Sequence, residues 1–172
     1  MSDKINYYTN SDILNKFPIL EQSDKTMILF IGIQASGKTT FYNNFFKNKY
    51  EHINLDTLHT RNKERIAIEQ CIALEKSFVV DNTNPKKIDR ERYIQTAKEH
   101  NYRILGCYFK SSISECVNRN ENRAGKAKVP TCAIAATSNK LELPDYGEGF
   151  DKIYYVRIEG TDTIIEDWRT DT

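Results

Sequence analysis

A glycine-rich segment around residue 35 carries the clearest chemical signal in this chain. It reads Gly32-Ile33-Gln34-Ala35-Ser36-Gly37-Lys38-Thr39 and continues with Thr40, which fits the pattern G-x-x-x-x-G-K-[ST]. Such glycines let successive backbone N–H groups face phosphates. Lys38 supplies a point charge to the β and γ phosphates, and the Thr39 hydroxyl can ligate Mg²⁺. We therefore expect a nucleoside triphosphate, ATP by default, bound by Gly32, Gln34, Ala35, Ser36, Gly37, Lys38, Thr39 and Thr40.

Two aspartates that follow later apolar segments could complete a phosphotransferase site. In small P-loop kinases a carboxylate at the place of Asp56 can take the proton from the attacking hydroxyl. A helix N-cap is the structural alternative for this residue. Asp81 can hold the Mg²⁺ ion through its waters or orient the acceptor, and Asn82 and Thr83 add hydrogen-bonding groups beside it. The glycine-rich motif alone does not separate a kinase from an ATPase or a GTPase.

The segment 118–130 is a candidate lid over the triphosphate. It contains four basic residues and one acidic residue, Glu121. Arg119 and Arg123 are spaced i,i+4, so on one helix they would share a face. A lid that brings arginines to the phosphates would suit phosphoryl transfer, because arginine stabilises the charge that develops there. The structural alternative is a solvated basic helix end.

Apolar runs that alternate with helical patterns must position these groups. Helices are predicted at about 38–47 and 61–75, from Asn84 as N-cap, from Ser112 with Glu115 as a capping box, and after Pro130. Short apolar runs predict five strands, at 27–31, 50–54, 77–80, 103–109 and 152–158. Alternating strands and helices predict an α/β fold, a P-loop kinase three-layer sandwich around a mainly parallel five-stranded sheet with a mobile lid. Ligands bind at the carboxyl ends of such strands.

Length and composition fit one globular domain. The 172 residues carry a net charge of +1, so any contact with nucleic acid must come from local basic clusters. We divide the chain into an N-terminal extension at 1–26, a kinase domain at 27–160 and a C-terminal tail at 161–172. No apolar run is long enough to cross a membrane, and the N-terminus lacks an apolar signal core. The four cysteines form no C-x-x-C pair, so we expect reduced thiols and a cytoplasmic location.

Several motifs together resemble the 5′-kinase module of polynucleotide kinases, both of bacteriophages and of the eukaryotic kinase–phosphatases. The matching stretches are Gly37-Lys38-Thr39-Thr40-Phe41, Asn54-Leu55-Asp56-Thr57-Leu58, Val80-Asp81-Asn82-Thr83-Asn84-Pro85, Arg119-Asn120-Glu121-Asn122-Arg123 with Val129-Pro130, and Glu148-Gly149-Phe150. The resemblance implies that Lys38 and Thr39 handle the triphosphate and Mg²⁺, with Asp81 as a further metal group. It implies that Asp56 is the general base on the 5′-hydroxyl of DNA or RNA, that Asp81, Asn82 and Thr83 line the acceptor groove, and that Arg123 and Arg119 contact the phosphates from the lid.

The chain departs from this pattern at two positions beside Asp56. The arginine that usually precedes the aspartate is Leu55 here, and phage-type enzymes have an arginine where this chain has His59. These differences leave a small-molecule kinase, acting on a sugar or a nucleoside, open as the second hypothesis. A nucleotide-binding regulatory module without transfer activity is the third. The choice between DNA and RNA and the oligomeric state also stay open.

Overall fold

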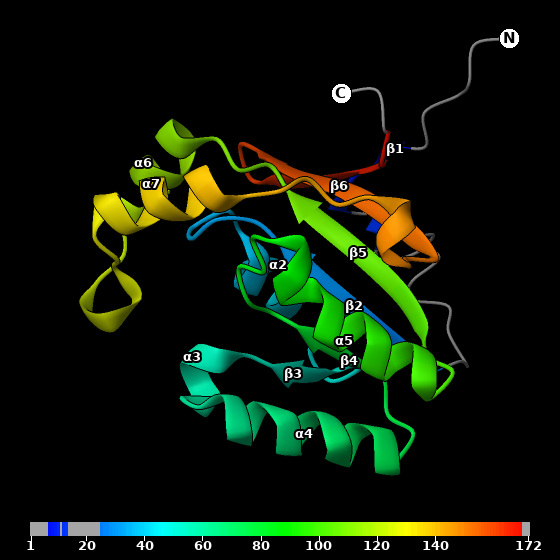
Figure 1. Cartoon of the computed structure of the whole chain (residues 1–172). Coiled ribbons are helices and arrows are strands. Elements are labelled where there is room, and N and C mark those ends of the chain that lie inside the picture. The colour runs from blue at the N-terminus through cyan, green and yellow to red at the C-terminus, as the bar shows by residue number, and fades with distance from the viewer. Residues whose placement is uncertain (1–6, 11, 14–24, 170–172) are drawn as a thin grey trace, which may run out of the picture.

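One mixed sheet organises the part of the chain that the computed structural model describes, residues 7–10, 12–13 and 25–169 (Figure 1). Within it, seven strands lie in the order β1-β7-β6-β5-β2-β4-β3. Their bounds are β1 Tyr7–Tyr8, β2 Thr26–Ile31, β3 Glu51–Ile53, β4 Phe78–Val80, β5 Arg103–Phe109, β6 Lys152–Glu159 and β7 Asp162–Asp167. The strands from β3 to β6 in this order run parallel, whereas β7 and β1 are antiparallel to their neighbours.

The α/β fold and the five predicted strands are confirmed, but the prediction of a five-stranded sheet was wrong. Two further strands extend the sheet beyond β6. β7 falls in the predicted C-terminal tail at 161–172. Its buried residues are Thr163, Ile164 and Ile165, of which only two are apolar, and acidic residues flank them, so the sequence shows no clear strand pattern. A tight turn at Gly160, with φ of 61°, joins β6 to β7, as glycine permits.

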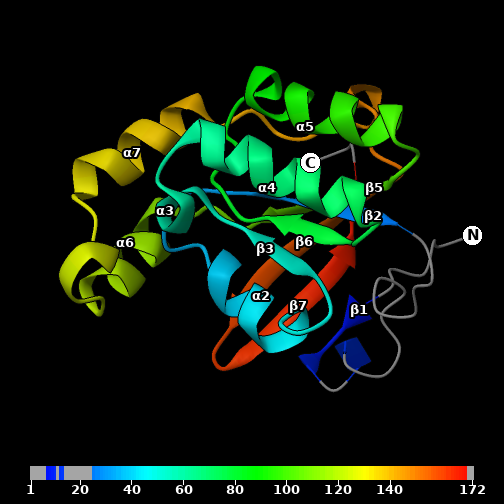
Figure 2. The ribbon, with the colours of Figure 1, turned by 90° about the horizontal axis from the view of Figure 1, so that it is seen from below.

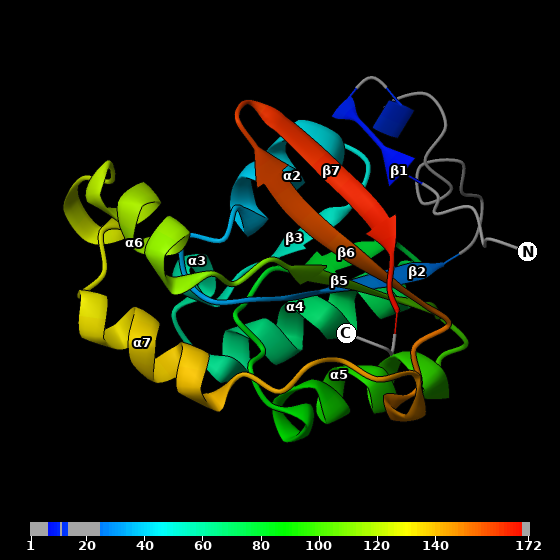
Figure 3. The same ribbon diagram turned by 90° about the horizontal axis from the view of Figure 1, so that it is seen from above.

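Helices cover both faces of the sheet, which gives the expected three layers. Their bounds are α2 Lys38–Phe45, α3 Leu55–Leu58, α4 Arg61–Ala73, α5 Lys87–Glu99, α6 Ile113–Glu121 and α7 Thr131–Lys140, with the short 3₁₀ turns η2 Gly125–Ala127 and η3 Tyr146–Glu148. Figure 2 shows α2 on one face and α4 and α5 on the other. The helices α3, α6 and α7 gather instead beyond the carboxyl ends of the strands (Figure 3).

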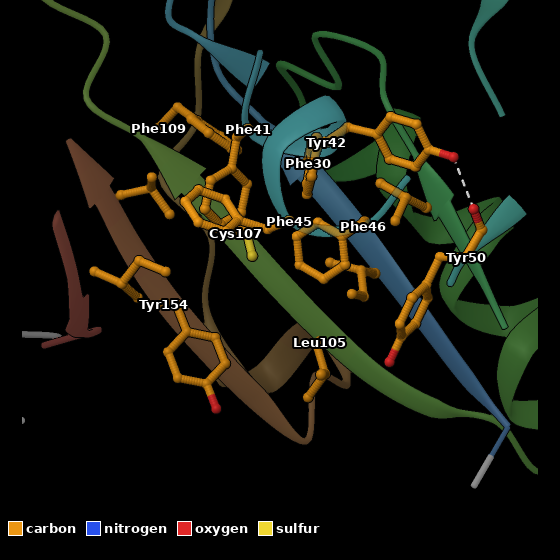
Figure 4. Close-up of a cluster of buried hydrophobic side chains, with 14 of the residues drawn as sticks. Phe30, Phe41, Tyr42, Phe45, Phe46, Tyr50, Leu105, Cys107, Phe109 and Tyr154 are labelled. Carbon is orange, nitrogen blue, oxygen red and sulfur yellow. Dashed lines mark hydrogen bonds between the residues drawn. The ribbon is translucent and has the colours of Figure 1, made fainter. Parts of the chain in front are cut away.

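Aromatic side chains fill the core between α2 and the sheet. Phe41, Phe45 and Phe46 pack against residues of β2, β5 and β6, as Figure 4 shows. Phe30 lies at 5.0 Å from Phe109 between ring centroids, in an edge-to-face arrangement, which is a favourable geometry for such rings. Burial of these side chains holds α2 against the face of the sheet. It thereby also holds the glycine-rich turn, which precedes α2, at the carboxyl end of β2.

The opposite core lies beneath α4 and α5. In α4 the buried residues are Glu64, Ile68 and Cys71, a stripe with helical spacing. The apolar pattern of residues 61–75 also predicts Ile66 and Leu74 as inward residues, but they are 40% and 66% exposed. Ile66 lies off the stripe that starts at Glu64, and Leu74 follows the last residue of the helix, so neither faces the sheet.

The N-terminal residues contribute to the same fold where they are described. The two residues of β1 pair with β7, and Ile13 is fully buried in the core on the α2 face. The sequence predicts an amphipathic patch of Ile13, Leu14, Phe17 and Ile19 in the N-terminal extension, and the last three of these residues lie outside the described part of the chain. Among the described residues, no helix combines the length and apolar character needed to span a bilayer. All four cysteines are free thiols, as expected.

Candidate active site

The glycine-rich loop lies between β2 and α2, as the motif requires. Gly37 has φ of 100° and Ala35 has φ of 60°, so the backbone turns through left-handed conformations there. A Cβ atom at Gly37 would collide with the side chain of Ile158. The neighbouring strand end fixes the loop as well, since the Gly32 N–H donates to the Thr83 carbonyl at 3.0 Å. These contacts fix the conformation of the loop.

Lys38 is buried inside this loop. Its Nζ donates to the carbonyl oxygens of Gly32 at 3.0 Å and Ile33 at 2.7 Å, and to Ser36 Oγ at 3.3 Å. Burial lowers the pKa of the Lys38 ammonium from 10.5 to about 8, against the opposing attraction of carboxylates that include Asp81. The Asp56 carboxylate raises this pKa, as Asp81 does, whereas the Arg123 guanidinium lowers it, as burial does. Three residues from different segments of the chain are thus close enough to Lys38 to be felt electrostatically.

We expect the affinity for ATP to weaken as the pH rises through about 8. Lys38 is protonated below its folded pKa of about 8, and deprotonation removes the charge that attracts the phosphates. If only the protonated form binds, the dissociation constant for ATP rises about tenfold between pH 7 and pH 9. Calorimetric titration at constant ionic strength measures this. Lys38→Met is the control and should show no such pH dependence; a change below twofold in the unaltered protein would contradict the assignment.

Asp81 is the second buried charge of the site, with 2% of its surface exposed. Its Oδ2 accepts from the Thr39 hydroxyl at 2.7 Å and contacts His52 Nε2 at 2.9 Å. The imidazole of His52 stacks on the Tyr42 ring with a centroid distance of 3.9 Å. His52 could not be predicted as a site residue, because nothing in the sequence distinguishes a histidine in a short strand. In the fold it fixes the carboxylate that faces the glycine-rich loop.

The Thr39 hydroxyl and the Asp81 carboxylate fit a Mg²⁺ ion. Both present oxygen, the ligand that this ion prefers, and they already meet at 2.7 Å. The described residues contain no cluster of three or more His, Cys, Asp or Glu that could hold a metal alone. A Mg²⁺ ion would therefore need phosphate oxygens and water as its other ligands, as is usual at phosphate sites. When bound, it would neutralise charge on the triphosphate.

Asp56 lies on the short helix α3, which follows β3. The N-cap of α3 is Asn54, whose side chain accepts from the Thr57 N–H at 3.2 Å. The structural alternative of an N-cap role for Asp56 is therefore not what the fold adopts. Asp56 is exposed, and its charge raises the pKa of the Lys38 ammonium. A carboxylate that is open to solvent and acts on the charge of Lys38 is available to an incoming hydroxyl.

The segment after β4 holds the site together. The Asn82 side chain bridges Glu64 and the Leu55 N–H, and the Thr83 carbonyl accepts from Gly32. The prediction that Asn84 is a helix N-cap was wrong: α5 begins at Lys87 with Lys86 as its N-cap. Asn84 is 3% exposed and donates instead to the Phe30 carbonyl at 2.8 Å. Its side chain serves the sheet rather than the helix.

The candidate lid, through α6, and the helix α7 that follows it both contact the glycine-rich loop. Arg119 Nε donates to the Ala35 carbonyl at 2.8 Å, and Gln34 Nε2 donates to Thr137 Oγ1 at 3.0 Å. The expectation that Arg119 and Arg123 share one helix face was wrong, because α6 ends at Glu121. Arg123 follows that end, where its Nη1 donates to the Ala127 carbonyl at 3.3 Å. The Arg123 charge nevertheless lowers the pKa of the Lys38 ammonium.

Comparison with known proteins identifies the family. A family model described as an AAA domain matches residues 27–144. This chain belongs to the AAA domain family. It is similar to a putative bifunctional polynucleotide phosphatase/kinase of Acanthamoeba polyphaga mimivirus, with 34% identity over 150 residues that are 83% of this chain and 36% of that protein. It is also similar to the bifunctional polynucleotide phosphatase/kinase of Schizosaccharomyces pombe, with 26% identity over 152 residues that are 86% of this chain and 37% of that protein.

These relatives confirm the resemblance to polynucleotide kinases that the motifs had indicated. The chain spans little more than a third of the length of either relative. Among solved structures, a gluconokinase from Sinorhizobium meliloti superposes with a TM-score of 0.58 and 18% identity, covering 81% of this chain and 86% of that one. At this identity the likeness concerns the fold alone.

A buried arginine anchors the far end of the lid in this member of the AAA domain family. Arg90 is fully buried, and its Nε and Nη2 bond the two oxygens of Glu148 at 2.7 and 2.8 Å. Its Nη1 donates to the carbonyls of Asn84 at 3.1 Å and Glu142 at 3.0 Å. Arg90 therefore joins α5, the segment after β4 and the chain that leaves α7.

Arg90→Met is expected to destabilise the fold by about 3–5 kcal/mol, because it leaves a buried carboxylate and carbonyl groups without their donor. Urea denaturation followed by circular dichroism measures the loss. Arg65→Met is the matched control, since Arg65 forms an exposed pair with Glu69 and should change stability by less than about 1 kcal/mol. A loss at Arg90 no larger than that of the control would refute the anchoring role.

Proposed function

We propose that this chain is an ATP-dependent polynucleotide 5′-hydroxyl kinase. The observation that carries the proposal is that Asp81, Asp56 and Arg123 all act on the charge of Lys38, which is buried in the glycine-rich loop. A phosphotransferase needs such a set: cations for the triphosphate, an oxygen ligand for the metal and a base for the acceptor. Relatives named as polynucleotide phosphatase/kinases support the choice of acceptor.

In the proposed reaction the 5′-hydroxyl oxygen forms a bond to the γ-phosphorus, while the bond from that phosphorus to the β-phosphate oxygen breaks and ADP leaves. The hydroxyl proton goes to the Asp56 carboxylate. Lys38 and the backbone of the glycine-rich loop bind the phosphates. Thr39 and Asp81 would supply oxygen ligands to Mg²⁺. Arg123, with Arg119, stabilises the charge that develops on the transferred group. For this, Arg119 would exchange the Ala35 carbonyl for a phosphate oxygen, so the lid would have to move.

The acceptor proposed here is the 5′-OH end of DNA or RNA. The chain has a net charge of only +1, but its basic residues form local clusters. Such clusters are enough for an enzyme that grips only the end of a nucleic acid. They lie in the lid, at Arg119, Arg123, Lys126 and Lys128, and at the start of α5, at Lys86 and Lys87. We further propose residues 27–160 as the kinase domain, with β7 and β1 extending its sheet. The free cysteines suit a reducing compartment such as the cytoplasm.

Transfer of labelled phosphate from ATP tests the proposal directly. The acceptors are DNA and RNA oligonucleotides with a 5′-OH, the same oligonucleotides with a 5′-phosphate as blocked controls, and a panel of nucleosides and sugars. Label on 5′-OH ends that declines steeply with salt supports the proposal, because contacts to backbone phosphates are salt-dependent. Label confined to small acceptors would replace it with the small-molecule kinase, and ATP binding without any transfer would favour a regulatory module.

A further inference from the structure

A buried carboxylate lies behind the acceptor side of the site. Glu64 is 3% exposed on the inward stripe of α4. Its oxygens receive three donors from three segments, Arg61 Nη1 at 2.9 Å, Asn82 Nδ2 at 2.7 Å and Tyr93 OH at 3.0 Å. A charge in such a place costs desolvation, and only a full set of hydrogen bonds makes it tolerable. The next inward positions of the same stripe, Ile68 and Cys71, are apolar. Packing against the sheet alone therefore does not require a carboxylate at position 64.

The Asn82 amide connects this carboxylate to the helix that bears Asp56. Its nitrogen donates to Glu64, and its oxygen accepts from the Leu55 N–H at 2.9 Å. A carboxylate only accepts and a backbone N–H only donates, so the two partners together permit a single orientation of the amide. Leu55 is the first residue of α3, and Asp56 is the second. The orientation of Asn82 thus fixes the N-terminal turn of α3.

We propose that Glu64 is a positioning residue, which holds Asn82 and through it the Asp56 carboxylate in line with the acceptor hydroxyl. The inference rests on the proposed function, since it assumes that Asp56 is the base. Glu64 itself touches neither substrate nor the reacting atoms. The sequence analysis assigned Asn82 to the acceptor groove, whereas here both ends of its amide serve the positioning of α3.

Glu64→Gln tests this role with little change of shape. If the glutamine oxygen accepts from Asn82, its NH₂ group faces the donor of Arg61; if it is turned round, two NH₂ groups meet. Either way one contact is lost. Because small misplacements of a catalytic group are costly, we expect turnover with a 5′-OH oligonucleotide to fall about tenfold to a hundredfold. The ATP dissociation constant should stay within twofold, because Glu64 does not contact the glycine-rich loop. Glu69→Gln, on the same helix but exposed, should leave both quantities unchanged.

A double-mutant comparison separates positioning from general damage. In an Asp56→Asn background Glu64→Gln should cause no further loss, because the group that it positions is gone. Turnover of Glu64→Gln within twofold of the unaltered protein would overturn the inference, and so would a full multiplicative loss in the Asp56→Asn background. If instead the unaltered protein labels no 5′-OH end, or Asp56→Asn does not slow it, the proposed function fails and not this inference alone.

Tyr93→Phe provides a second route if Glu64→Gln folds poorly. It removes one donor to the carboxylate and keeps the ring in the core. We expect a smaller loss of turnover in the same direction, again absent when Asp56 is asparagine. Unchanged turnover in Tyr93→Phe, with Glu64→Gln unfolded, would count against the proposal.

Discussion

Lys38→Met is expected to lower phosphoryl transfer about a thousandfold, because it removes the cation that the phosphates need. Methionine keeps most of the buried aliphatic stem and removes only the ammonium. That group sits among the loop carbonyls of Gly32 and Ile33, and it must turn towards the β and γ phosphates when ATP binds. Transfer of label from ATP to a 5′-OH oligonucleotide under single-turnover conditions measures the loss.

A matched control separates loss of the ammonium from loss of structure. Lys49 is exposed, so Lys49→Met should leave transfer and the thermal midpoint unchanged. Lys38→Met should unfold at a temperature close to that of the unaltered protein, because the aromatic core between α2 and the sheet does not involve the ammonium. Transfer that stays within tenfold of the unaltered protein would mean that the glycine-rich loop is not where the phosphates bind.

The parallel part of the sheet could be predicted because strands that are buried on both faces appear in the sequence as continuous apolar runs. Phe78–Val80 is a continuous apolar run, as is most of Thr26–Ile31, and both are buried on two faces. β7 could not be found in this way. It lies near the edge of the sheet, and its acidic ends can remain solvated, so the pattern of Asp162–Asp167 resembles that of a polar tail.

The residues of the candidate site also fall into two groups, those that the sequence predicts and those that only the fold reveals. The groups that we propose to face a ligand, such as Lys38 and Asp56, each stand in a short motif whose spacing is set by its own local backbone. The groups behind them are held by tertiary contacts between distant segments. Arg90 and Glu148 are 58 positions apart in sequence. Nothing local distinguishes either residue from the many solvated charges on helices, so only the fold reveals that they are buried together.

Helix ends were the other source of error. Arg119 and Arg123 have the spacing of one helical face, yet α6 stops between them. Asn120 explains the early end, since its side chain donates to the Val129 carbonyl at 2.7 Å and accepts from the Val129 N–H at 3.1 Å. This pair of bonds draws the chain after α6 back towards the helix. Arg123 consequently approaches the site from a loop, which suits a group that has to follow a closing lid.

Asp56→Asn is the second large expected effect, a loss of about 10²–10⁴-fold in turnover. Asparagine has the same shape but cannot take the proton of the attacking hydroxyl. Asp56 is exposed on α3, and the cap that starts this helix is Asn54, so the substitution should not weaken the fold. Label transfer at saturating ATP and oligonucleotide measures turnover, and calorimetry measures the affinity for ATP.

The effect should fall on turnover and not on ATP binding, because a base acts only once the acceptor begins to attack. Removing the negative charge beside Lys38 should leave ATP binding unchanged or slightly tighter, since phosphates and a carboxylate repel each other. Equal turnover in both proteins would show that the hydroxyl loses its proton without help from Asp56. A loss confined to ATP affinity would move Asp56 from the acceptor to the nucleotide, and the choice of α3 as the acceptor side would have to be abandoned.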